Sequence, residues 1–125
     1  MIRPTVNLVA AINKELREPD EFFGDDDELD RVERVLRGTE GIADPVRLAG
    51  ALMSRLARAQ AFAEGNKRTA LAIAHLILSF NGVEPETYLP PEDAAIPNFL
   101  VRAARGEDVE HGVLKAMSGK IEVTL

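Results

Sequence analysis

The stretch NKRTALAIAHLILSFN, residues 66–81, decides how this chain folds. After its polar start it is apolar on almost every side of a helical wheel, because residues 70–74 and 76–78 are all apolar and only His75 separates them. A helix of this kind in a water-soluble domain is normally the buried central one. The sequence therefore predicts a compact, all-α domain of six helices around this helix, which Gly82 ends.

Three helices are expected before the central one, from the spacing of apolar residues and from capping residues. The first spans about residues 5–17. The second is capped by Asp26 or Asp27 and ended by Gly38. The third has Asp44 as its N-cap, a proline at the first helical position, and an apolar face that stops near residue 60.

After the central helix, the proline-rich residues 84–91 read as a connector. A fifth helix is expected up to Arg105, broken or restarted at Pro97. Gly106 stops it and Asp108 caps the sixth. The alternation of apolar and polar residues over 121–125 predicts a short terminal strand. The 125 residues make one domain, residues 1–125.

Composition excludes several classes of protein. The chain has no cysteine, so disulfides, thiolate zinc sites and thiol nucleophiles are absent. With 15 basic and 21 acidic residues the net charge is −6, which disfavours direct binding to nucleic acid or to an anionic membrane. No run of 18 apolar residues could span a bilayer, and the start of the chain makes a poor signal peptide. These observations predict a cytoplasmic protein.

Chemistry is concentrated in QAFAEGNKRTA, residues 60–70, at the start of the central helix. Helix N-termini favour anions, and Gly65 lets the backbone approach a ligand closely. Arg68 offers a planar fork for phosphate and Lys67 adds a point charge. Glu64 is the acid that would hold Mg²⁺ beside phosphates. These residues describe a nucleotide-phosphate cradle, although the same residues would also serve as a simple turn and helix cap.

Residues 62–70 also resemble the motif of the Fic/Doc family, His-x-Phe-x-(Asp/Glu)-(Gly/Ala)-Asn-(Gly/Lys)-Arg. Lys67, followed by Thr-Ala-Leu, is similar to the Doc branch, the "death on curing" toxins of toxin–antitoxin pairs. The resemblance extends over roughly residues 5–118. It implies a Doc-sized helical domain whose central helix begins in the motif.

The resemblance implies a function. Fic proteins transfer AMP from ATP to a protein hydroxyl, whereas Doc-type toxins transfer a phosphoryl group to elongation factor Tu and stop translation. The position of Glu64 would hold Mg²⁺, those of Asn66, Lys67 and Arg68 would bind the phosphates of ATP, and Phe62 would pack in the core to set the loop. The helical tail of an antitoxin would occupy a groove beside the site, next to the end of the third helix.

The chain departs from the family motif at the general base, because Gln60 stands where the family has histidine. Imidazole accepts a proton near neutral pH, whereas a carboxamide only forms hydrogen bonds. Three explanations stay open: a mutated toxin, a natural member that only binds nucleotide or protein, or another base. His75 is expected to be a core or interface residue and His111 a surface residue, so neither replaces the base.

The acidic residues 22–30 occupy the place of the family's flap, which aligns the target segment. Their charges also suit a solvated loop that ends in a helix cap. The paired phenylalanines Phe22 and Phe23 keep a contact with a target or antitoxin open. The prediction is thus a Doc-like phosphotransferase scaffold, and the alternatives are an inactive binding module and a Fic-type AMP transferase.

Overall fold

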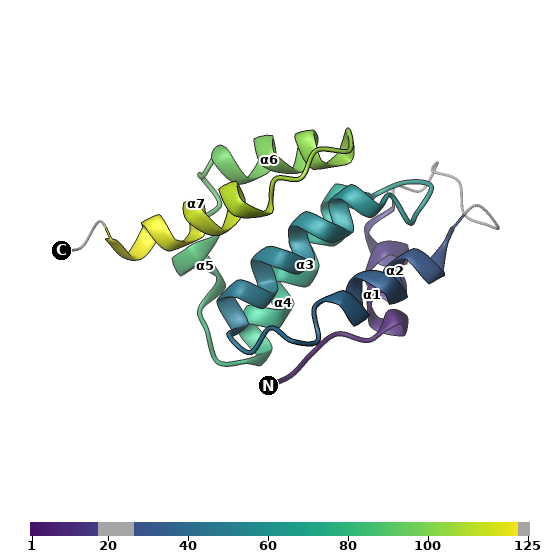
Figure 1. Ribbon diagram of the computed structural model, residues 1–125, viewed down its shortest axis with the longest axis horizontal. Helices are drawn as coiled ribbons and strands as arrows, with labels where there is room; N and C mark the ends of the chain where they lie inside the picture. The colour runs from purple at the N-terminus through teal and green to yellow at the C-terminus, as the bar shows by residue number, and fades with distance from the viewer. Residues whose placement is uncertain (18–26, 123–125) are drawn as a thin grey trace.

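The computed structural model describes residues 1–17 and 27–122, and of the last three of these only the backbone. The described residues form helices and no strand, which confirms the all-α prediction (Figure 1). There are seven described helices, namely α1 (Val6–Leu16), α2 (Leu29–Gly38), α3 (Pro45–Ala59), α4 (Asn66–Phe80), α5 (Pro85–Tyr88), α6 (Ala95–Ala104) and α7 (Glu110–Glu122).

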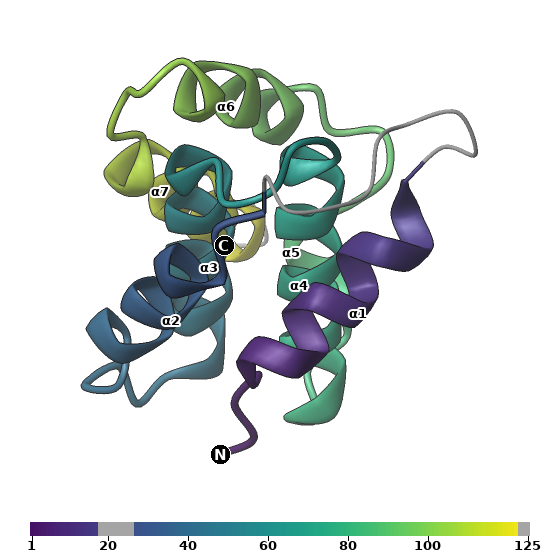
Figure 2. The same cartoon turned by 90° about the vertical axis from the view of Figure 1, so that its right-hand side faces the viewer.

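The helices pack in a layered arrangement around α3 and α4, which lie side by side (Figure 2). Helix α1 packs on the far side of α4, while α2 and α7 pack against α3 and α6 lies across the top of the pair in Figure 2. The buried core comes from all of these helices, with Val9, Leu52, Ile73, Leu100 and Val113 among its members. The loop between α3 and α4 therefore emerges from the centre of the domain.

The centre consists of two helices, and α3 is more completely buried than α4. Small residues on α3 let its neighbours approach closely. A Cβ atom added to Gly50 would lie 2.6 Å from Cδ2 of Leu114 and 3.2 Å from Sδ of Met117, both on α7. The sequence predicted α4 alone as the buried central helix, because α4 is apolar nearly all round whereas α3 carries arginines. In the structure the arginines of α3 lie along one exposed edge, and α4 leaves Phe80 43% exposed.

Two of the three helix starts in the first half of the chain have a side-chain cap, and the sequence had predicted one of them, at Asp44. Thr5 caps α1 by accepting a hydrogen bond from the Leu8 amide, and Asp44 caps α3, with Pro45 in the first position as predicted. The prediction for α2 is wrong at Asp27, because Glu28 is the N-cap residue and makes no side-chain cap. Asp26, the other candidate, lies outside the described residues, as do most of the predicted flap residues.

The C-terminal half contains three departures from the prediction. The connector includes a short helix, α5, because Glu84 accepts from the Glu86 amide at its start. Pro97 does not break α6, since it lies in the first turn, where its missing N–H is not needed. The predicted terminal strand is wrong at Ile121 and Glu122, which continue α7, and its remaining residues lie outside the described part.

Candidate functional site

The motif residues lie in a short loop, residues 60–65, and in the first turn of α4; we call residues 60–65 the motif loop. Two residues with positive φ delimit it, Gln60 at 51° and Gly65 at 77°. Gln60 ends α3 and Gly65 immediately precedes α4. The first-turn amides of α4 therefore point towards the space beside the loop, as the N-terminus of a helix requires.

Asn66 holds the loop in this shape. Its Oδ1 accepts a hydrogen bond from the Phe62 amide at 3.0 Å, and its Nδ2 donates to the Phe62 carbonyl at 2.8 Å. The Phe62 ring is buried in the core. Phe62 anchors the loop by packing in the core, and Asn66 closes the loop by binding the Phe62 backbone. The Asn66 side chain is therefore engaged, and the backbone N–H of Asn66 remains for a ligand.

Gly65 and Arg68 lie together at the start of α4. A Cβ atom on Gly65 would stand 3.5 Å from Nη2 of Arg68, and the φ of 77° would strain any other residue. Arg68 is exposed, and its Nη1 donates to the Leu16 carbonyl at the end of α1, at 2.6 Å. The guanidinium therefore borders the loop, on the side where a side chain at position 65 would block a ligand from reaching the backbone.

Glu64, which precedes Gly65, and Lys67, in the first turn of α4, both expose their side chains. Among the described residues, no three histidine, aspartate or glutamate side chains cluster closely enough to hold a metal ion. The donor set fits Mg²⁺ of the kind that keeps several waters and is bound by one or two carboxylates plus substrate phosphates. A metal at this place would rest on the Glu64 carboxylate and on oxygens brought by a nucleotide.

Gln60 does not point into the loop. Its Nε2 donates to the Ala57 carbonyl of α3 at 2.7 Å, so the side chain folds back over the end of its own helix. The residue is exposed. In this position the carboxamide acts as a helix cap and offers no proton acceptor.

Three polar residues that bind around the motif loop were not predicted as site residues: Asn13 of α1, Arg17 at the C-cap of α1, and Asp27 before α2. Asn13 and Arg17 are buried, with 1% and 7% of their surfaces exposed. A signal was present, because Asn13 and Arg17 are four residues apart on the face of α1 that also carries the buried Val9. Polar residues on an apolar helix face require partners. Asn13 finds one in the motif loop, at the Glu64 carbonyl, and Arg17 binds Asp27, which in turn accepts from the Ala63 amide of the loop.

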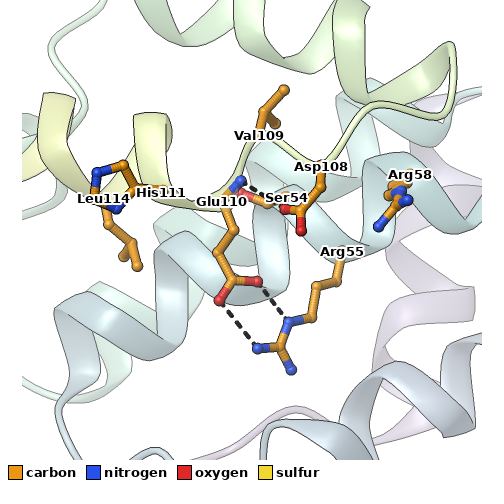
Figure 3. Close-up of a pocket in the computed structure, with 8 residues that line it drawn as sticks. All are labelled: Ser54, Arg55, Arg58, Asp108, Val109, Glu110, His111 and Leu114. Atoms are coloured by element: carbon orange, nitrogen blue, oxygen red, sulfur yellow. Dashed lines mark hydrogen bonds and ion pairs between the residues drawn. The ribbon is translucent and has the colours of Figure 1, made fainter.

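A cavity of about 660 Å³ lies away from the motif, between α3 and the start of α7 (Figure 3). Arg55 and Glu110 face each other there in a two-pronged ion pair, with Nε–Oε1 and Nη2–Oε2 distances of 2.6 and 3.0 Å. This carboxylate raises the pKa of Arg55 above its ordinary value. Since two arginines, Arg55 and Arg58, and two acids, Asp108 and Glu110, line the cavity, it presents no excess of either charge to a ligand.

The predicted groove beside the end of α3 corresponds to two further cavities of about 300 and 400 Å³ between α2 and α3. Their walls are not simply apolar, because arginines of both helices contribute to them. They are lined by Arg31, Arg34, Val35, Gly38, Arg55, Arg58 and Ala59. Arg31 donates to the Ala59 carbonyl at 3.0 Å, which ties this groove to the last turn before the motif loop.

The two histidines lie away from the loop. His75 is half-buried and lines a small cavity of about 250 Å³ with Leu71 and Leu89. His111 is exposed on α7, as predicted, and borders the cavity of Figure 3. No described hydrogen bond or ion pair connects either residue to the motif residues.

No helix in the described part of the chain combines the length and apolar character that crossing a membrane requires.

Comparison with known proteins gave one match, to a family model. Searches of curated proteins and of solved structures returned no match. A family model described as Fic/DOC matches residues 5–78, which include α1 to α3, the whole motif loop and α4 except its last two residues. The match covers more than half of the chain, and we conclude that this chain belongs to the Fic/DOC family.

Proposed function

We propose that the chain is a Doc-like toxin domain, a scaffold for binding ATP with Mg²⁺ and for transferring a phosphoryl group to a protein hydroxyl, in which Gln60 stands in place of the general base of the transfer step. One observation carries the proposal. Gly65, with positive φ, opens the 15-residue helix α4 and stands beside the Arg68 guanidinium, and the nearby residues Glu64 and Lys67 expose their side chains. Backbone amides, a guanidinium, an ammonium and a carboxylate at one helix N-terminus are the groups that bind a nucleotide's phosphates.

Each residue has a role in this proposal. The amides of Gly65, Asn66 and Lys67 donate to phosphate oxygens, and Arg68 supplies a fork that spans two of them. The Glu64 carboxylate would hold Mg²⁺, whose contribution there would be to neutralise phosphate charge. The target hydroxyl attacks the γ-phosphorus, its oxygen forms the new P–O bond, and the bond to ADP breaks. The hydroxyl proton needs an acceptor, and Gln60 does not provide one.

The missing acceptor favours a second candidate function, a binding module without catalytic activity. The observation in its favour is the Gln60 side chain, which caps the Ala57 carbonyl and is turned away from the loop. Such a module would bind nucleotide and a partner protein. AMP transfer, the third candidate, is less favoured because Lys67 stands where the AMP-transferring members have glycine.

The proposed partners are an antitoxin and elongation factor Tu, in the cytoplasm. The antitoxin's helical tail would occupy the groove between α2 and α3, whose wall reaches the end of α3 beside the motif loop. An amphipathic helix fits a groove in which Val35 and Ala59 offer apolar contacts and arginines line the walls. Direct contact with nucleic acid is not part of the proposal, since the chain is acidic overall.

The class of reaction is tested by the group that reaches the target. Elongation factor Tu is incubated with Mg²⁺, the protein and ATP labelled at either the α- or the γ-phosphorus. We expect the Gln60→His variant to transfer γ-label alone. Transfer of α-label identifies an AMP transferase and contradicts the proposal. No transfer by a variant that binds ATP leaves the binding module as the function.

A further inference from the structure

A continuous set of hydrogen bonds, buried where it leaves α1 and exposed where it reaches Ala63, joins α1 to both sides of Glu64 in the motif loop. The side chains of Asn13, Arg17 and Asp27 form these bonds, and we call the three residues the α1 network. Asn13 and Arg17 lie in the interior, and the Arg17 side chain is 1% exposed. These are expensive positions for polar groups unless their hydrogen bonds serve the fold or the site.

Asn13 contacts the loop directly. Its Nδ2 donates to the Glu64 carbonyl at 2.9 Å and to Oγ1 of the buried Thr69 at 3.1 Å. Its Oδ1 accepts from Nε of Arg17 at 2.7 Å. Both donors and the acceptor of this one carboxamide are therefore used, and they fix the peptide that joins Glu64 to Gly65 relative to the first turn of α4.

Arg17 and Asp27 hold the other side of Glu64. Nη2 of Arg17 contacts Oδ1 of Asp27 at 2.5 Å, and the same oxygen accepts from the Ala63 amide at 3.0 Å. The guanidinium also lies over the Phe62 ring, 5.9 Å from its centre. The Ala63 N–H and the Glu64 C=O are thus fixed by residues from two other segments of the chain.

The loop has few means of its own to keep this shape. The side chains of Ala63 and Glu64 are exposed, and Gly65 has no side chain to pack. Local fixation comes from Phe62 and Asn66, which lie at the two ends of this segment. The α1 network binds the two backbone groups between those ends. It thereby also sets the direction in which the Glu64 carboxylate leaves the loop.

We propose that Asn13, Arg17 and Asp27 are positioning residues, which hold the motif loop so that Glu64 and the amides of Gly65–Lys67 face one phosphate group. This inference rests on the proposed function for its ligand. The shape of the loop itself does not depend on a ligand, so the network can be tested separately from nucleotide binding.

The test uses Asn13→Asp. This variant keeps the size of the side chain and the acceptor for Arg17, but it replaces the donor that faces the Glu64 carbonyl with an oxygen. Asn7→Asp is the matched control, because Asn7 lies on the exposed face of the same helix. Asp27→Ala is the second variant, and it removes the acceptor of the Ala63 amide. Thermal unfolding identifies the temperature range in which each variant is folded.

Two quantities are measured in that range, amide hydrogen exchange at Ala63 and the affinity for ATP with Mg²⁺. We expect exchange at Ala63 to rise about tenfold in Asp27→Ala, the effect of one lost hydrogen bond. It should also rise in Asn13→Asp, because losing the bond to the Glu64 carbonyl releases the loop around Ala63, and it should stay unchanged in Asn7→Asp. ATP affinity should fall by a similar factor in the same two variants. Unchanged exchange at Ala63 overturns the network, and raised exchange with unchanged ATP affinity overturns its positioning role.

Failure of the proposed function is distinguishable from failure of the network. If the unmodified protein binds no ATP, the phosphate site is wrong. The exchange comparison at Ala63 still decides whether the α1 network holds the loop.

Discussion

Replacing Gln60 by histidine should raise the rate of phosphoryl transfer by about 10²–10⁴-fold, the usual contribution of a positioned general base. This corresponds to roughly 3–5 kcal/mol of activation free energy at about 1.36 kcal/mol per factor of ten. The other groups of the motif are present in the loop, so the substitution adds proton acceptance to an existing cradle. ATP affinity should change far less than the rate.

The backbone at position 60 accepts this substitution. Gln60 has a φ of 51°, in the left-handed region, where histidine occurs more often than most residues. The substitution also removes the hydrogen bond to the Ala57 carbonyl, which frees the side chain from the end of α3. Histidine is therefore compatible with the backbone conformation at position 60, and its side chain is not held against the end of α3.

The measurement is transfer of labelled γ-phosphate to elongation factor Tu, with Gln60→Asn as the control. Asparagine also tolerates the left-handed region but accepts no proton, so a gain specific to histidine isolates the base. Growth arrest in a bacterial host should follow the same order. Equal, negligible transfer by the histidine and asparagine variants, with ATP bound by both, would show that the scaffold is not a latent kinase.

Replacing Glu64 by alanine should abolish the Mg²⁺-dependent part of ATP binding. We expect a loss of at least about 100-fold, because changing residues that merely orient metal ligands already costs roughly 10–100-fold. The fold should be unaffected, within about 0.5 kcal/mol, since the Glu64 side chain is exposed. The backbone carbonyl that binds Asn13 remains in the variant.

Calorimetry with ATP, with and without Mg²⁺, measures this effect. Glu40→Ala is the control, because Glu40 is an exposed acid in the turn after α2 and lies outside the motif. It removes the same charge from the protein without touching the loop. Equal Mg²⁺-dependent affinities for the Glu64 variant and the unmodified chain would exclude Glu64 as the metal ligand.

Local sequence signals predicted much of the fold because local interactions decide those features. Asp44 and Pro45 start α3 through contacts within one turn, and the alignment of apolar residues marked α4 as buried. Pro97 misled the prediction, because its effect depends on whether α6 begins before or after it. The strand prediction failed at Ile121 for a similar reason, since a short alternation of apolar and polar residues also fits the last turn of a helix.

The candidate site was predicted in its residues but not in its support. The motif residues 60–68 are contiguous, so their resemblance to a family was visible in the sequence. The partners of the loop are distant in the chain: Asn13 binds Glu64 across 51 positions, and Asp27 binds Ala63 across 36. Such contacts follow from how α1 packs on α4, which no local pattern specifies.

The proposed function requires that the phosphates of ATP bind at the start of α4. The most direct test is the perturbation of backbone amide resonances when ATP and Mg²⁺ are added to the unmodified protein. We predict that the largest shifts occur at Gly65, Asn66 and Lys67. Largest shifts instead at Arg55 and Glu110, in the cavity between α3 and α7, or no shifts at saturating ATP, would contradict the claim.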